Sequence, residues 1–92
     1  MNAAKFQELE RFVEDRNRQE QRQGGELSWE VYKKGRYKIE LLNFMPWDYP
    51  DMDEGANYFF VDMVEEVEDE FGIKCVSYDW LDNHVSQAIF KG

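Results

Sequence analysis

The sequence has little of several residue types on which common protein functions depend. It contains one cysteine, one histidine and no threonine among 92 residues. The lone thiol excludes an intramolecular disulfide and a thiolate metal cluster, which fits a reducing compartment. The candidates for a nucleophile and its base are few: His84, Cys75, Ser28, Ser77 and Ser86. Because a catalytic set would have to use nearly all of them, we expect no catalytic residue and no enzymatic activity.

Long apolar runs and an excess of basic residues are also lacking. No stretch approaches the roughly 18 apolar residues of a membrane span, and the first ten residues lack the apolar run of a signal peptide. Lysine and arginine number 11 against 20 aspartate and glutamate, a formal charge of −9. A nucleic-acid binder needs a basic footprint, so this total argues against direct contact with nucleic acid. We expect a cytoplasmic protein with no membrane partner.

The abundant residues predict one folded domain over 1–92. Hydrophobic residues make up 42% of the chain and aromatic residues 16%, enough to fill a core. The expected fold class is α+β, with the order αββαββ and an antiparallel sheet on which the helices pack. Its segments are a helix over 1–23, a β-hairpin over 26–45, an acidic aromatic loop over 46–55, a helix over 56–71 and a second hairpin over 73–91.

Apolar residues at helical spacing define the two helices. The first carries one narrow stripe, made by Phe6, Leu9, Phe12 and Val13. Beyond it, the helix is expected to continue toward Gly24-Gly25 on Glu14–Arg18 and Arg16–Glu20 pairs, exposed to solvent and liable to fray. The second carries its apolar face on Phe60, Val64, Val67 and Phe71, flanked by Ala56 and Met63, and Gly72 provides the C-terminal stop.

Side-chain pairing predicts where the first hairpin turns. A three-residue loop Lys33-Lys34-Gly35, with the glycine in the left-handed conformation, pairs Tyr32 with Arg36. The same register sets apolar residues opposite each other: Val31 with Tyr37, Trp29 with Ile39 and Leu27 with Leu41.

The tail has two interpretations. A hairpin turning at Asp82-Asn83 sets Trp80 opposite Val85 and Val76 opposite Ile89. A C-terminal helix is the alternative, because Leu81, Val85 and Ile89 also recur at i,i+4 spacing behind a possible Asp79 cap. Weak helix formers in the segment favour the hairpin.

The negative charge is concentrated in one part of the chain. Residues 1–38 hold nine basic and seven acidic residues, whereas residues 39–92 hold two and thirteen. Between Lys38 and Lys74 there are eleven carboxylates and no lysine, arginine or histidine. Solvated surfaces usually mix both signs, because a field of one sign repels itself. The cation-free run therefore needs an explanation beyond solubility.

Two candidate binding surfaces lie in this run. One is the polar face of the second helix, where Asp62, Glu65, Glu66, Asp69 and Glu70 are expected, with Glu68 at its border. Asp62 to Glu70 spans about 12 Å, over which duplex DNA carries roughly seven phosphates. The other is the preceding loop, in which Trp47 and Tyr49 would anchor a partner among Asp48, Asp51, Asp53 and Glu54.

Neither a cofactor nor a metal is expected. The alternating carboxylates from Asp51 resemble a calcium loop, but Ala56 occupies the position where an EF-hand needs glycine, and Asp62 replaces the usual final glutamate.

The cation-free run and its two acidic surfaces resemble a class of small acidic proteins. These are the anti-defence proteins of phages and mobile elements: anti-CRISPR proteins, the uracil-DNA glycosylase inhibitor and other acidic DNA mimics. Nuclease immunity proteins such as barstar are similar in size and sign. The resemblance implies a stoichiometric inhibitor that occupies the basic nucleic-acid site of an enzyme or ribonucleoprotein, in the host bacterial cytoplasm if the chain is phage-encoded. The alternative is a non-catalytic adaptor, or regulatory module, that binds through the aromatic loop and the sheet.

Overall fold

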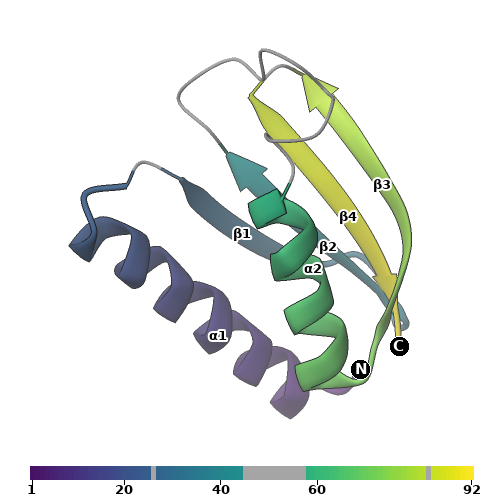
Figure 1. Ribbon diagram of the computed structural model, residues 1–92. Helices are drawn as coiled ribbons and strands as arrows, with labels where there is room; N and C mark the ends of the chain where they lie inside the picture. Colours follow the sequence, from purple (N-terminus) through teal and green to yellow (C-terminus); the bar gives the residue numbers. More distant parts are fainter. Residues whose placement is uncertain (26, 45–57, 83) are drawn as a thin grey trace.

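Two helices pack on a four-stranded antiparallel sheet (Figure 1). This computed structural model describes residues 1–25, 27–44, 58–82 and 84–92. Its elements are α1 Ala3–Arg22, β1 Ser28–Lys33, β2 Lys38–Phe44, α2 Tyr58–Phe71, β3 Lys74–Asp82 and β4 Val85–Lys91. The α+β class and the order αββαββ are as predicted, and the tail forms the hairpin rather than the helix.

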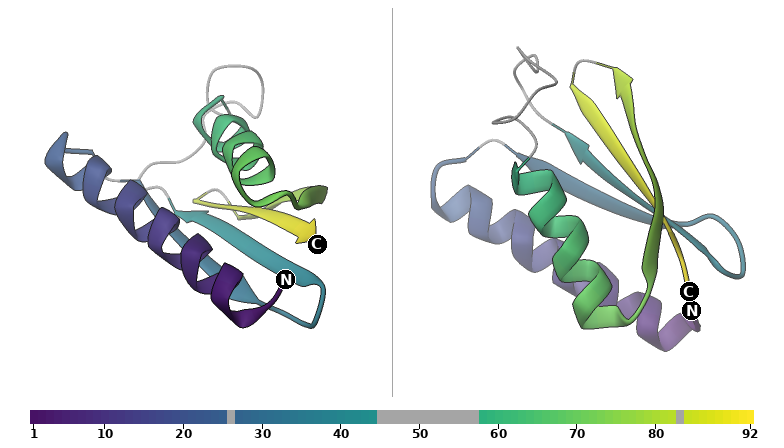
Figure 2. Two further views of the ribbon diagram at one scale, coloured as in Figure 1. Left: turned by 90° about the horizontal axis from the view of Figure 1, so that it is seen from below. Right: turned by 45° about the vertical axis from the view of Figure 1, so that its right-hand side comes forward.

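The strand order is β1-β2-β4-β3, so β2 and β4 are central and β1 and β3 are the edges. Both helices lie on the same side of the sheet (Figure 2). Alternate residues of the central strands point to that side and are buried in the core: Ile39, Leu41, Ala88 and Phe90. The opposite side, here called the open face, carries the residues between them, including Glu40, Gln87 and Ile89.

The first helix begins and ends where the sequence indicates. The Asn2 side chain caps its N-terminus by accepting a hydrogen bond from the Lys5 N–H at 2.8 Å. Gly24 follows its C-terminus with a φ of 74°. The predicted apolar stripe faces the core, and most residues of the helix beyond it are exposed, as predicted, with two exceptions that contact other elements. Arg16 and Asn17 are half-buried and bond to α2 and β1, respectively.

The second helix buries the predicted face. Phe60, Val64, Val67 and Phe71 are all buried, as is Met63 beside them. Gly72 adopts a φ of 65°, and its N–H donates to the Glu68 carbonyl at 2.9 Å, which ends the helix as predicted.

The register predicted for the first hairpin is wrong by four residues. The Lys34 N–H donates to the Lys38 carbonyl at 2.9 Å, so the three-residue turn is Gly35-Arg36-Tyr37 rather than Lys33-Lys34-Gly35. Trp29 lies opposite Asn43 instead of Ile39, Val31 opposite Leu41 instead of Tyr37, and Gly35 has no positive φ. An even shift leaves each side chain on its face, so the apolar pattern alone does not distinguish the two registers.

The register predicted for the second hairpin is right at one end only. Cys75 pairs with Phe90 as that register requires, but an irregularity follows, and Ser77 rather than Val76 lies opposite Ile89. Trp80 lies opposite Ser86 rather than Val85, and β4 begins at Val85, opposite Asp82. Each bulge places an extra residue on β3, which the side-chain pattern does not reveal.

Candidate protein-binding surface

The exposed side of α2 is a continuous acidic surface. It consists of Asp62, Glu65, Glu66, Asp69 and Glu70, and all five are exposed, as predicted. At 100° per residue these positions cover an arc of about 140°, and they span about 12 Å along the axis. No basic residue lies in the last turn of the helix. The carboxylates near its C-terminus therefore remain unfavourable to the helix dipole, by about 0.3–1 kcal/mol each.

One carboxylate of this acidic face is neutralised from outside the helix. Arg16 of α1 forms an ion pair with Glu66, and the two side chains are 28% and 49% exposed. The sequence predicts Glu20 as the partner of Arg16, because the spacing of residues along the chain indicates only contacts within one helix. Among the described residues, the other four carboxylates have no ion pair.

Glu68, at the border of the acidic face, has a structural role. Its carboxylate accepts a hydrogen bond from the backbone N–H of Cys75 at 2.8 Å. Because β3 is an edge strand, this bond satisfies a donor that no neighbouring strand can reach. Glu68 therefore fastens β3 to α2 and does not belong with the freely exposed carboxylates.

The predicted loop surface lies outside the described residues. This applies to Trp47, Asp48, Tyr49, Asp51, Asp53 and Glu54. The described residues resume at α2, so the proximity of this loop to the acidic face is inferred from sequence adjacency alone.

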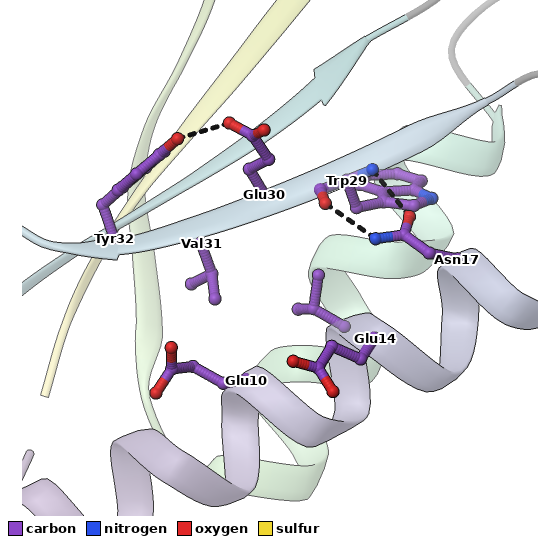
Figure 3. Close-up of a pocket in the computed structure, with 8 residues that line it drawn as sticks. Glu10, Glu14, Asn17, Trp29, Glu30, Val31 and Tyr32 are labelled. Atoms are coloured by element: carbon purple, nitrogen blue, oxygen red, sulfur yellow. Dashed lines mark hydrogen bonds between the residues drawn. The ribbon is translucent and has the colours of Figure 1, made fainter.

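A shallow cleft of about 170 Å³ between α1 and β1 was not predicted. Figure 3 shows Glu10 and Glu14 of α1 directed toward β1, with Glu30 and Tyr32 on the other side of the strand. The phenol of Tyr32 donates a hydrogen bond to Glu30, and this bond is the main reason that the pKa of Tyr32 is raised. The i,i+4 spacing of the two glutamates was visible in the sequence, but the position of β1 over them was not.

Asn17, which also lines this cleft, bonds to β1 (Figure 3). Its side-chain NH2 donates to the Trp29 carbonyl at 2.9 Å, and its side-chain oxygen accepts from the Trp29 N–H at 2.8 Å. The amide thus takes the place of a neighbouring strand at this residue of the sheet edge.

The side chains that were considered for catalysis are dispersed. Cys75 pairs with Phe90, whereas Ser86 lies four residues away along β4, a separation of about 13 Å. His84 lies in the turn between β3 and β4. Burial raises the pKa of the Cys75 thiol, with a smaller contribution from the negative charge of Glu68. This shift lowers the thiolate fraction and so opposes nucleophilic reactivity.

Within the described ranges, no group of three or more histidine, cysteine, aspartate or glutamate side chains is arranged to hold a metal ion. No helix among these residues is long and apolar enough to cross a membrane. Comparison with protein-family models, with curated proteins and with solved structures found no match for this chain.

Proposed function

We propose that this protein is a stoichiometric inhibitor that imitates the charge of nucleic acid. Its acidic face occupies the basic nucleic-acid-binding site of a bacterial defence nuclease or CRISPR-type effector in the cytoplasm. No catalytic step is involved, and inhibition follows from competition for one site.

The observation that carries the proposal is the acidic face itself. Five exposed carboxylates share one side of a helix whose other side is buried, and four of them have no ion pair among the described residues. Over about 12 Å, this approaches the roughly seven charges that duplex DNA presents. A surface with this charge density attracts a basic groove at long range and speeds association with it.

The test uses two variants of equal net charge. D62N/E65Q/D69N removes three carboxylates of the acidic face but keeps Glu66 and its ion pair with Arg16. E8Q/E10Q/E20Q removes three carboxylates of α1. Both change the formal charge from −9 to −6, since each removes three negative charges. The wild-type protein and both variants are used as bait in a lysate of a bacterium that carries nuclease-based or CRISPR-type defences.

We expect the wild type and the α1 variant to capture a nuclease or effector complex that added nucleic acid displaces. The acidic-face variant should bind that complex at least tenfold more weakly and with less dependence on salt. A partner whose binding is unaffected by added nucleic acid and by the acidic-face substitutions would refute the proposal that the protein mimics nucleic acid. If Trp47→Ala alone then abolished binding, the protein would be an adaptor that binds through its aromatic loop.

A further inference from the structure

Four lysines form a row across the open face of the sheet, one near the same end of each strand. Lys34 pairs with Lys38 through the hydrogen bond that closes the first turn. Lys38 pairs with Lys91 of β4, and Lys91 pairs in turn with Lys74 of β3. Lys34 also lies 3.4 Å from Glu40, a residue of the open face, which places it on that side. At about 4.8 Å between strands, the row is about 14 Å long.

This row is unfavourable for the isolated molecule. Like charges directly opposite each other in neighbouring strands repel, and three such pairs occur in succession. Glu40 offsets the positive charge of Lys34 alone. Its carboxylate is itself buried and accepts a hydrogen bond from Gln87. Among the described residues, Lys38, Lys74 and Lys91 have no carboxylate partner, although the chain carries a surplus of carboxylates.

Two tyrosines and an arginine lie next to this row in the first hairpin. The β1–β2 turn contains Arg36 and Tyr37, with the guanidinium 5.7 Å from the centre of the Tyr37 ring. Tyr37 is 61% exposed and Tyr32 is 42% exposed. The turn is attached to the end of β4 by a hydrogen bond of 3.1 Å from the Gly92 N–H to the Tyr37 carbonyl. Figure 2 shows this turn beside the C-terminus.

We propose that this basic-aromatic end of the sheet binds a single strand of nucleic acid. The lysine ammonium group binds phosphate as a compact point charge, without the fixed geometry of an arginine fork. Exposed aromatic rings beside a line of cations are the combination that binds single strands, through stacked bases and a neutralised backbone. The phosphates follow the lysine row, and bases stack on Tyr37 and Tyr32.

The total charge of −9 does not reveal this site, because the lysines come from three separate parts of the chain. Residues 34 and 38 lie in the first hairpin, whereas 74 and 91 are the only two basic residues of the second half. The strand order β1-β2-β4-β3 brings them into line. The site lies on the face of the sheet opposite the helices and is independent of the proposed function, since neither surface needs the other.

The test is the binding of fluorescein-labelled dT15 and U15 by fluorescence anisotropy at 50 and 200 mM salt. If four phosphates are neutralised, the affinity of the wild type should fall about 50-fold between these salt concentrations. K38Q/K74Q/K91Q should bind at least tenfold more weakly at 50 mM salt, with only about a threefold fall on going to 200 mM. Tyr37→Ala should lose affinity without changing the salt dependence, because stacking releases no counterions.

The matched control is R11Q/R18Q/R22Q, which removes three cations of α1 and gives the same formal charge of −12 as the lysine variant. It should bind the oligonucleotides as the wild type does, within about twofold. The absence of binding to both oligonucleotides at 50 mM salt would overturn the proposal, as would equal losses in the lysine variant and the control. Binding of poly-glutamate as tight as that of dT15, unaffected by Tyr37→Ala, would instead identify an acidic protein as the partner and would also overturn it.

Discussion

At the scale of single residues, Cys75 shows how the local environment restrains a reactive group. Its thiol lies on the core side of β3, partly buried, and burial is the main cause of its raised pKa. The Glu68 carboxylate, whose oxygen accepts from the Cys75 N–H, adds a smaller repulsion of the thiolate. Because both effects favour the neutral thiol, the folded chain retains this proton to higher pH than the unfolded chain does.

We predict that alkylation of Cys75 by iodoacetamide has a pH midpoint above that of an ordinary thiol. In Glu68→Gln the midpoint should fall, because the amide oxygen can still accept from the Cys75 N–H while the negative charge is gone. The measurement is the alkylation rate from pH 7 to 11, with the urea-unfolded protein as reference. Linkage gives the sign for stability: the unfolded chain loses the proton first, so the contribution of Cys75 declines as pH rises above the ordinary thiol pKa. A native midpoint equal to that of the unfolded chain would contradict this.

At the scale of elements, the two edges of the sheet are closed in the same way. Asn17 of α1 bonds to both backbone groups of Trp29 on β1, and Glu68 of α2 bonds to the Cys75 N–H on β3. Open edges are sites of unwanted strand pairing, and side chains from a neighbouring helix are one means of covering them. The two helices thus cover one face of the sheet and also close part of each edge.

We predict that Asn17→Ala destabilises the protein by about 1–3 kcal/mol, because the N–H and C=O of Trp29 lose their partners. Trp29 is 3% exposed, so water cannot readily replace the lost hydrogen bonds. The exposed Gln19→Ala on the same helix is the control and should change stability by less than about 0.5 kcal/mol. Urea unfolding measures both, and equal midpoints for the two variants would show that the edge contact contributes nothing.

The elements could be predicted from the sequence to a greater extent than their registers could. The faces of α1 and α2 follow from apolar spacing, and glycines at Gly24 and Gly72 mark their ends. The strand register did not follow, because shifting the first hairpin by four residues leaves Trp29 and Val31 on the same face. Which strands are neighbours is a tertiary property, so neither the Arg16–Glu66 ion pair nor the lysine row was visible in the sequence.

At the scale of the whole molecule, two separate surfaces each carry mainly one sign of charge. The acidic face lies on α2, and the lysine row lies on the far side of the sheet, near its end. The formal charge of −9 averages over both. Each surface repels itself, and packing across the sheet separates them so that they do not neutralise each other. This separation is the physical basis for proposing two independent binding surfaces.

The destabilisation that repulsion within the acidic face causes should be measurable in the free protein. D62N/E65Q/D69N removes several i,i+3 and i,i+4 repulsions, each about 0.2–0.5 kcal/mol, and one carboxylate near the end of the helix dipole. We therefore predict that it stabilises the protein by about 1 kcal/mol or more at 20 mM salt, which raises the Tm by about 4–8 °C. In about 0.5 M salt most of the gain should disappear through screening.

The α1 variant E8Q/E10Q/E20Q separates local from global repulsion, because it reaches the same formal charge of −6. The carboxylates of α1 are interspersed with arginines, and Arg18 contacts both Glu14 and Asp15, so like charges are less concentrated there. Thermal unfolding at low salt should therefore show a smaller gain for this variant. Equal increases in Tm for the two variants would mean that only the net charge matters and that α2 carries no additional local repulsion. A larger gain on α2 means that its carboxylates are kept at a cost to folding, as expected of a surface that serves binding.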